Sequence, residues 1–188
     1  PHTPWDWAAL DGTLWIEDGK PYMIFCHEWL QTVDGTMDVV QLPKNLGVPK
    51  KKPYTIFKAS DAEWSGEMLE LGEKTNGMDI GGYVTDGPWV FRTQTGKLGM
   101  LWSSWGKKRY SIGVAYSESG KLKGPWIQEE EPLFGDNGGH GMMFRTFDGK
   151  LKLCMHYVDS NDERPSRKPM ILDVDDSGDK LMLIGGIK

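Results

Sequence analysis

The chain has 188 residues, enough to bury one sizeable core, and 22 basic against 27 acidic residues give it a net charge of −5. No basic stripe is present, so we expect neither nucleic acid nor a membrane as a partner. No run approaches the roughly 18–20 apolar residues of a membrane span. The first residues lack a basic head and an apolar core, so either export is not needed or its signal lies upstream of Pro1.

The first predicted unit covers residues 5–60. It opens with Asp11-Gly12-Thr13-Leu14-Trp15-Ile16, and a Gly19-Lys20 turn leads into a second apolar run. Alternation and glycine-containing turns predict strands over 11–16, 21–25, 37–42 and 54–58. An insertion loop follows over 59–82, with one short helix expected around 62–71.

Two further units repeat this layout, and in each the opening hairpin turns at a Gly-Lys pair. The second unit, over 83–130, opens with Asp86-Gly87-Pro88-Trp89-Val90-Phe91. Its later strands are predicted over 98–102, 111–116 and 126–128. The third unit, over 137–188, opens with Gly139-His140-Gly141-Met142-Met143-Phe144. Its later strands are predicted over 151–155, 169–174 and 180–184.

Three similar units without a linker predict one structural unit over residues 1–188, all-β, built as four-stranded antiparallel blades of a β-propeller. In such an array the first strands gather at a common axis, so Asp11, Asp86 and His140 are expected to converge there. A propeller closes with typically four to eight blades. Three blades therefore predict either a part of a larger propeller or closure through a second copy.

These anchors resemble, in this order, the last three of five blade motifs in glycoside hydrolase family 43, whose five-bladed propellers cut arabinose- and xylose-containing glycans. Residues 9–15 resemble the third-blade Asp motif, 85–89 the fourth-blade acid-Gly-Pro motif and 138–144 the fifth-blade Gly-His-Gly motif. The family's first-blade Asp, its general base, and its second-blade Trp-Ala-Pro motif have no counterpart here. The family usually has Glu where this chain has Asp86.

The resemblance implies an inverting, two-carboxylate glycosidase of the α-L-arabinofuranosidase/β-xylosidase type, of which this chain is a part lacking the general base. Asp86 matches the general acid. Asp11 matches the carboxylate that orients the acid and raises its pKa through like charge. Asp-Gly pairs can also be plain turn residues, as expected for Asp34 and Asp148. Asp11 and Asp86 differ because each precedes an apolar run.

The resemblance also places His140 at the propeller axis, beside the substrate or a cation. No cofactor is required, and a structural Ca²⁺ at the axis is the candidate ion, with His140 as the metal-site residue. His140 alone would hold calcium poorly. The alternative is a buried histidine that is hydrogen-bonded to the backbone.

The strand ends supply further candidates, because polar residues close the second strand of each unit: His27-Glu28-Trp29, Ser103-Ser104-Trp105 and His156. This repetition predicts that they face one pocket. Glu28 is a reserve candidate for the acid, and we expect it to bind substrate together with His27, Trp29 and Trp105; plain exposed strand ends are the alternative. Trp29 and Trp105 belong to the tryptophans at predicted loop positions, which favour sugar stacking: Trp5, Trp7, Trp29, Trp64 and Trp105.

The expected partner is an oligo- or polysaccharide, together with the missing N-terminal blades or a second copy that closes the propeller. Two alternatives stay open: a carbohydrate-binding propeller segment without catalysis, and a structural scaffold that pairs with itself. The full-length protein is expected to be secreted or periplasmic, with the cytoplasm as the alternative. Cys26 and Cys154 lie within apolar strand patterns, which favours buried thiols over a disulfide.

Overall fold

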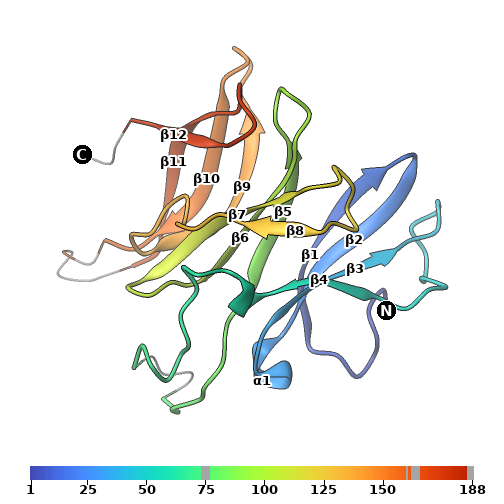
Figure 1. The fold of residues 1–188 in the computed structure, drawn as a ribbon, viewed down its shortest axis with the longest axis horizontal. Helices are drawn as coiled ribbons and strands as arrows, with labels where there is room; N and C mark the ends of the chain where they lie inside the picture. The colour runs from blue at the N-terminus through green and yellow to red at the C-terminus, as the bar shows by residue number, and fades with distance from the viewer. Residues whose placement is uncertain (73–76, 160, 162–165, 186–188) are drawn as a thin grey trace.

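The computed structural model describes residues 1–72, 77–159, 161 and 166–185. These residues form three four-stranded antiparallel sheets that follow one another across the molecule (Figure 1). The predicted all-β architecture of four-stranded blades is confirmed. No helix in the described part of the chain is long and apolar enough to cross a membrane.

The first blade has the strand order β1-β2-β3-β4. Its strands are β1 (Ala9–Glu17), β2 (Lys20–His27), β3 (Thr36–Gln41) and β4 (Tyr54–Lys58). Asp18 and Gly19, which join β1 to β2, both have positive φ angles, 50° and 69°, as a type I′ hairpin turn requires. A four-residue helix α1 (Trp29–Thr32) follows β2, and the 3₁₀ turn η1 (Ala59–Asp61) follows β4.

The second and third blades repeat the pattern. The second consists of β5 (Asp86–Arg92), β6 (Leu98–Trp105), β7 (Tyr110–Ser117) and β8 (Trp126–Gln128). The third consists of β9 (Gly138–Arg145), β10 (Leu151–Tyr157), β11 (Lys168–Asp175) and β12 (Met182–Ile184). The first strands are neighbours in space, since β1 contacts β5 and β5 contacts β9. This is the arrangement that the sequence pattern predicted.

The predicted helix around residues 62–71 is wrong. This segment is made of turns, and Ser65 pairs with Gly106 in an isolated bridge. The backbone N–H of Gly66 donates to the carbonyl of Trp105 at 2.8 Å. Pairing with the second blade therefore replaces the hydrogen bonds that a local helix would have made.

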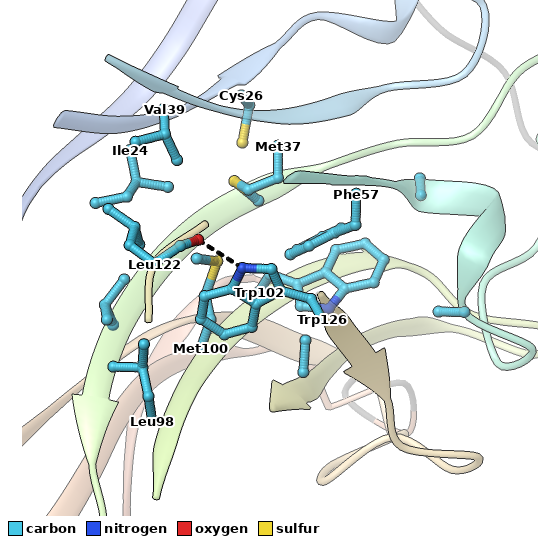
Figure 2. Packing of buried hydrophobic residues seen from close by; sticks show 14 of the residues in the cluster. Ile24, Cys26, Met37, Val39, Phe57, Leu98, Met100, Trp102, Leu122 and Trp126 are labelled. Atoms are coloured by element: carbon cyan, nitrogen blue, oxygen red, sulfur yellow. Dashed lines mark hydrogen bonds between the residues drawn. The ribbon is translucent and has the colours of Figure 1, made fainter. Parts of the chain in front are cut away.

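The middle blade forms the centre of the core. Every residue of β7 is buried, because the first and third blades cover both faces of the sheet. Figure 2 shows the contact with the first blade, where Ile24, Met37 and Phe57 lie against Met100 and the fully buried Trp102. Burying such a side chain contributes about 1.5–3 kcal/mol, so this interface fixes the relative position of two blades.

The outer faces of the first and third blades are less covered. Along β1, intermediate and exposed residues alternate strictly, and Leu14 and Ile16 are 52% and 55% exposed. On the third blade, Met142, Phe144 and Ile171 are also exposed. Both outer faces thus present apolar side chains among the residues described.

Candidate active site

The first strand of each blade carries a β-bulge close to its start. In every case two residues face a single residue of the neighbouring strand: Asp11-Gly12 opposite Phe25, Gly87-Pro88 opposite Trp102, and His140-Gly141 opposite Met155. The first residue of each bulge has a positive φ, 56° for Asp11, 52° for Gly87 and 51° for His140. For a residue other than glycine this conformation costs on the order of 1–3 kcal/mol, and it recurs where a bulge redirects a side chain.

Asp86 does not share this position. It precedes the bulge and pairs with Ser103, so its equivalents in the other blades are Leu10 and Gly139. The motifs containing Asp11 and Asp86 look alike in sequence but are offset by one residue in the structure. The carboxylate Oδ2 of Asp11 accepts a hydrogen bond from the backbone N–H of Gly87 at 3.1 Å, which ties the first blade to the bulge beside Asp86.

Gly87 could not carry a side chain without strain at this point. Besides its positive φ, a Cβ would lie 2.9 Å from Cδ2 of His140 and 3.2 Å from its Cα. The absence of a side chain therefore allows β5 and β9 to approach closely at the axis.

The three predicted anchors converge. One ligand-type atom from each of Asp11, Asp86 and His140 lies within 4.8 Å of the others, and Nε2 of His140 is 3.7 Å from Oδ1 of Asp11. The side chains of His140 and Asp11 are 45% and 25% exposed. The predicted convergence is confirmed, whereas the catalytic roles of these residues stay predictions.

Asp86 lies in a setting that favours its neutral form. Burial raises the pKa of Asp86, and the nearby carboxylate of Asp11 raises it further. A hydrogen bond from the hydroxyl of Tyr110 to Oδ2, 2.7 Å long, lowers the pKa, as do the charges of His140 and Arg167. Since burial is the largest of these effects, the pKa of Asp86 is raised overall.

A cavity of about 450 Å³ opens beside Asp86. Its lining combines aromatic, imidazole, amide and cationic groups: Asp86, Trp105, Tyr110, Asn137, His140, His156, Val158 and Arg167. The rings of Tyr110 and His156 stack with centroids 5.2 Å apart, and Trp105 meets Tyr110 edge-on at 5.8 Å. Burial lowers the pKa of His156, and Arg167 and His140 lower it further, which favours the neutral imidazole.

Only some of the residues that line this cavity were predicted from the sequence. Trp105 lies at the cavity as expected, and so does His156, which was noted at a strand end. Tyr110, Asn137 and Arg167 were missed, because none belongs to an opening motif. The start of β7 lies beside the end of β6, so the strand-end pattern that selected Trp105 could also have pointed to Tyr110.

Other strand-end candidates lie elsewhere. The prediction for Trp29 is wrong: this residue begins α1, is 6% exposed and packs against Met68 and Val84. His27 stacks on Trp7 with centroids 4.0 Å apart and hydrogen-bonds Oε1 of Gln31 at 2.8 Å, outside the residues that line the cavity.

Of the remaining tryptophans at predicted loop positions, Trp64 is also buried, at 3% exposed, and is not available for stacking. Trp5 is 89% exposed.

Glu28 lies outside the cavity lining, but its carboxylate interacts electrostatically with those of Asp86 and Asp11. It is the N-terminal cap of α1, and its carboxylate accepts from the backbone N–H of Leu30 at 3.5 Å. Burial raises the pKa of Glu28, and the charges of Asp86 and Asp11 also raise it, so the three carboxyl groups influence one another. Glu28 does not line the cavity, and its role as a reserve acid stays a prediction.

The axial cluster does not fit a directly bound calcium ion. Calcium takes six to eight oxygen ligands, whereas the described cluster offers two carboxylates and an imidazole nitrogen. Two of the four carboxylate oxygens are also engaged, since Oδ2 of Asp11 and Oδ2 of Asp86 accept hydrogen bonds from protein groups. We therefore derive no catalytic step through an ion.

A family profile and several solved structures match this chain. The profile of the family described as glycosyl hydrolases family 43 matches residues 1–179. A search of curated proteins gives no significant match.

Among solved structures, an endo-arabinase from Bacteroides thetaiotaomicron is 42% identical, with a TM-score of 0.78 over 90% of this chain and 57% of that one. An endo-1,4-β-xylanase from the same organism is 24% identical, with a TM-score of 0.70 over 97% of this chain and 60% of that one. A calcium-free β-xylosidase/α-arabinofuranosidase from a compost metagenome, in complex with xylotriose, is 20% identical, with a TM-score of 0.53 over 82% of this chain and 45% of that one. This chain thus spans about three fifths or less of each of these three structures.

Proposed function

This chain belongs to family 43 of the glycosyl hydrolases, and we propose that its axial site supplies the general acid of an inverting glycosidase. The observation that carries the proposal is the position of Asp86, partly buried, facing the cavity and close to Asp11 and His140. The proposed substrates are arabinose- or xylose-containing glycans, in keeping with the endo-arabinase and endo-xylanase among the similar structures.

In the proposed reaction, protonated Asp86 donates its proton to the glycosidic oxygen that leaves. Asp11 acts through Asp86: its negative charge raises the pKa of the acid, and its hydrogen bond to the N–H of Gly87 fixes the neighbouring backbone. Water would be activated by a carboxylate outside this chain, at the roughly 6.5–9.5 Å separation that inversion requires.

The cavity wall supplies the groups that a sugar ring needs. Trp105 offers an aromatic face or edge, and Asn137, His140 and Arg167 offer polar contacts around the ring. His156 stacks on Tyr110, and its lowered pKa favours a neutral ring that can exchange hydrogen bonds with sugar hydroxyls without adding charge near the acid.

Carbohydrate binding without hydrolysis is the second candidate for the chain by itself. It is favoured by the aromatic and polar cavity, whose described lining residues lie in this chain, whereas the proposed base lies outside it. Calcium at the axis, held largely through water, and secretion or periplasmic location of the full-length protein also stay proposals.

The test uses the complete enzyme, meaning this chain together with the blades that carry the base. Asp86→Asn and Asp11→Asn should each reduce turnover of arabino- or xylo-oligosaccharides by about 10²–10⁴-fold, the usual contribution of general acid catalysis. Asp148→Asn, which changes an exposed carboxylate in a hairpin turn, is the matched control and should leave turnover unchanged. Near-normal turnover in both axial variants would overturn the proposal.

A further inference from the structure

A chain of buried hydroxyl groups leads from the third blade to the proposed acid. The backbone N–H of His140 donates to Oγ of Ser103 at 2.8 Å. The hydroxyl of Tyr110 donates to Oδ2 of Asp86 at 2.7 Å, and the neighbouring Ser103 lowers the pKa of this phenol. Ser103 is fully buried and Tyr110 is 8% exposed, so solvent does not compete for these bonds.

The number of protons gives this chain a direction. Ser103 accepts from a backbone N–H, which can only donate. Its influence lowers the pKa of Tyr110, as a hydroxyl that donates toward the phenol oxygen does. Tyr110 has one proton, and it is directed at Oδ2 of Asp86. Burial raises the pKa of Tyr110 well above its usual value, so the phenol keeps this proton throughout the working pH range. Oδ2 is therefore an acceptor whether Asp86 is ionised or neutral.

The backbone of the third blade leaves room for the hydroxyl chain. A Cβ on Gly139 would lie 2.8 Å from Oγ of Ser103 and 2.8 Å from Cε1 of Tyr110. Three elements therefore cooperate: β6 supplies Ser103, β7 supplies Tyr110, and β9 passes close by without a side chain and contributes the N–H of His140.

We propose that Ser103 and Tyr110 are positioning residues that hold Oδ2 of Asp86 as an acceptor and so place the transferable proton on Oδ1. This inference rests on the proposed function, because it assigns the proton of the proposed general acid to one oxygen. It also explains how an aspartate, one methylene shorter than the glutamate usual in the family, is held in one orientation. When Asp86 is neutral, a half-turn of its carboxyl group would bring the acid O–H against the hydroxyl of Tyr110 and lose this hydrogen bond.

Other groups also act on Asp86, and the test must separate them from Tyr110. The titratable and charged groups that face it are Asp11 on β1, Cys26 on β2, Glu28 before α1, His140 on β9, His156 on β10 and Arg167 before β11. A substitution that removes only the hydroxyl of Tyr110 leaves all of these in place. It removes a hydrogen bond to the ionised form, so the pKa of Asp86 must rise.

The experiment follows the carboxyl carbon of Asp86 by ¹³C NMR during a pH titration of the complete enzyme. Tyr110→Phe should raise the pKa of Asp86 by about one to two units, the size expected for a hydrogen bond to a charged group. Ser103→Ala, a smaller change that guards against misfolding of the first variant, should raise the pKa by less. Tyr116→Phe is the matched control, because Tyr116 lies buried on the same strand and its hydroxyl accepts from the N–H of Leu181. An unchanged pKa in Tyr110→Phe, or an equal shift in Tyr116→Phe, overturns the proposal.

Kinetics then separate this inference from the proposed function. The acid form of Asp86 is lost as pH rises through its pKa, so Tyr110→Phe should move the alkaline limb of the kcat/KM profile to higher pH and lower the maximum. If Asp86→Asn retains activity, the proposed function fails and the inference fails with it. If Asp86→Asn is inactive and the alkaline limb of Tyr110→Phe does not move, the inference alone fails.

Discussion

At the scale of single residues, the site depends on backbone conformations that are rare for side-chain-bearing residues. Asp11 and His140 both occupy positive φ at a bulge, and Gly87 does so between them. The convergence of the anchors could be predicted, because first strands gather at a propeller axis. The one-residue offset of Asp86 could not, because bulge register is set by contacts between blades, such as that of Asp11 with the N–H of Gly87.

The hydrogen bond between Tyr110 and Asp86 could not be predicted either. Tyr110 lies 24 residues from Asp86, in a strand of the same blade, and no local motif marks it as a partner of the acid. Only the pairing of β6 with β7, combined with the depth at which Asp86 is buried, brings the two side chains together.

Asp86 should destabilise the folded protein at neutral pH. Burial raises its pKa in the folded state, so ionisation is unfavourable above that pKa, and the penalty disappears below the unfolded-state pKa. Asp86→Asn should therefore raise Tm at pH 7, and the gain should shrink as the pH falls toward 4. Thermal unfolding at both pH values measures this, and an equal gain at both would contradict the raised pKa.

Gly87→Ala should destabilise the protein by about 1–3 kcal/mol, because the new methyl group meets the ring of His140 in a conformation already strained by positive φ. Gly149→Ala is the control: its φ is +85°, and a Cβ there would meet nothing within 4 Å, so this variant reports backbone strain alone. Denaturant unfolding gives both values. If the two variants lose the same free energy of unfolding, the contact with His140 adds nothing to the cost of backbone strain.

At the scale of the elements, contacts between blades decide what local sequence patterns leave open. The hairpins were predictable because alternation and turn residues are local signals. The burial of Trp29 was not, since it depends on Met68 and Val84, which pack against it from a later part of the chain. The turns at 62–72 have the same cause: pairing with the second blade replaces a helix.

The buried carboxylate of Asp176 joins the second and third blades through two hydrogen bonds. Asp176, 4% exposed, accepts from Nε2 of Gln94 at 2.7 Å and from the guanidinium of Arg145. Asp176→Ala should destabilise the protein by about 1–3 kcal/mol, because it removes two hydrogen bonds to a buried, charged acceptor.

The matched control is Asp148→Ala, which removes an exposed ion pair with Lys150 and should cost about 0–1 kcal/mol. Denaturant unfolding of the two variants compares a contact between blades with one inside a single hairpin. A loss for Asp176→Ala no larger than that for Asp148→Ala would show that the contact contributes little to blade packing.

At the scale of the whole molecule, the outer blade faces indicate further structure. Leu14 and Ile16 on the first blade, and Met142 and Phe144 on the third, are exposed on sheets whose other faces are packed. We propose that the remaining blades of the complete enzyme cover them, with a second copy of this chain as the alternative occupant.

If other blades cover this face, a substitution on it should affect the complete enzyme more than the 188-residue chain. Leu14→Ser should change the stability of the 188-residue chain by less than about 0.5 kcal/mol, as an exposed substitution does, but should destabilise the complete enzyme by about 1–3 kcal/mol. Denaturant unfolding of both proteins provides the two numbers. Equal, small effects in both would show that the first blade keeps this face exposed.

The central claim is that Asp86 is the general acid. It is tested most directly by how the activity of the Asp86→Asn variant depends on the leaving group of the substrate. The complete enzyme is assayed on a natural oligosaccharide and on a dinitrophenyl glycoside, whose leaving group needs no protonation. General acid catalysis by Asp86 predicts a loss of at least about 10²-fold in kcat/KM on the oligosaccharide and little loss on the dinitrophenyl substrate. Equal losses on both substrates would contradict it.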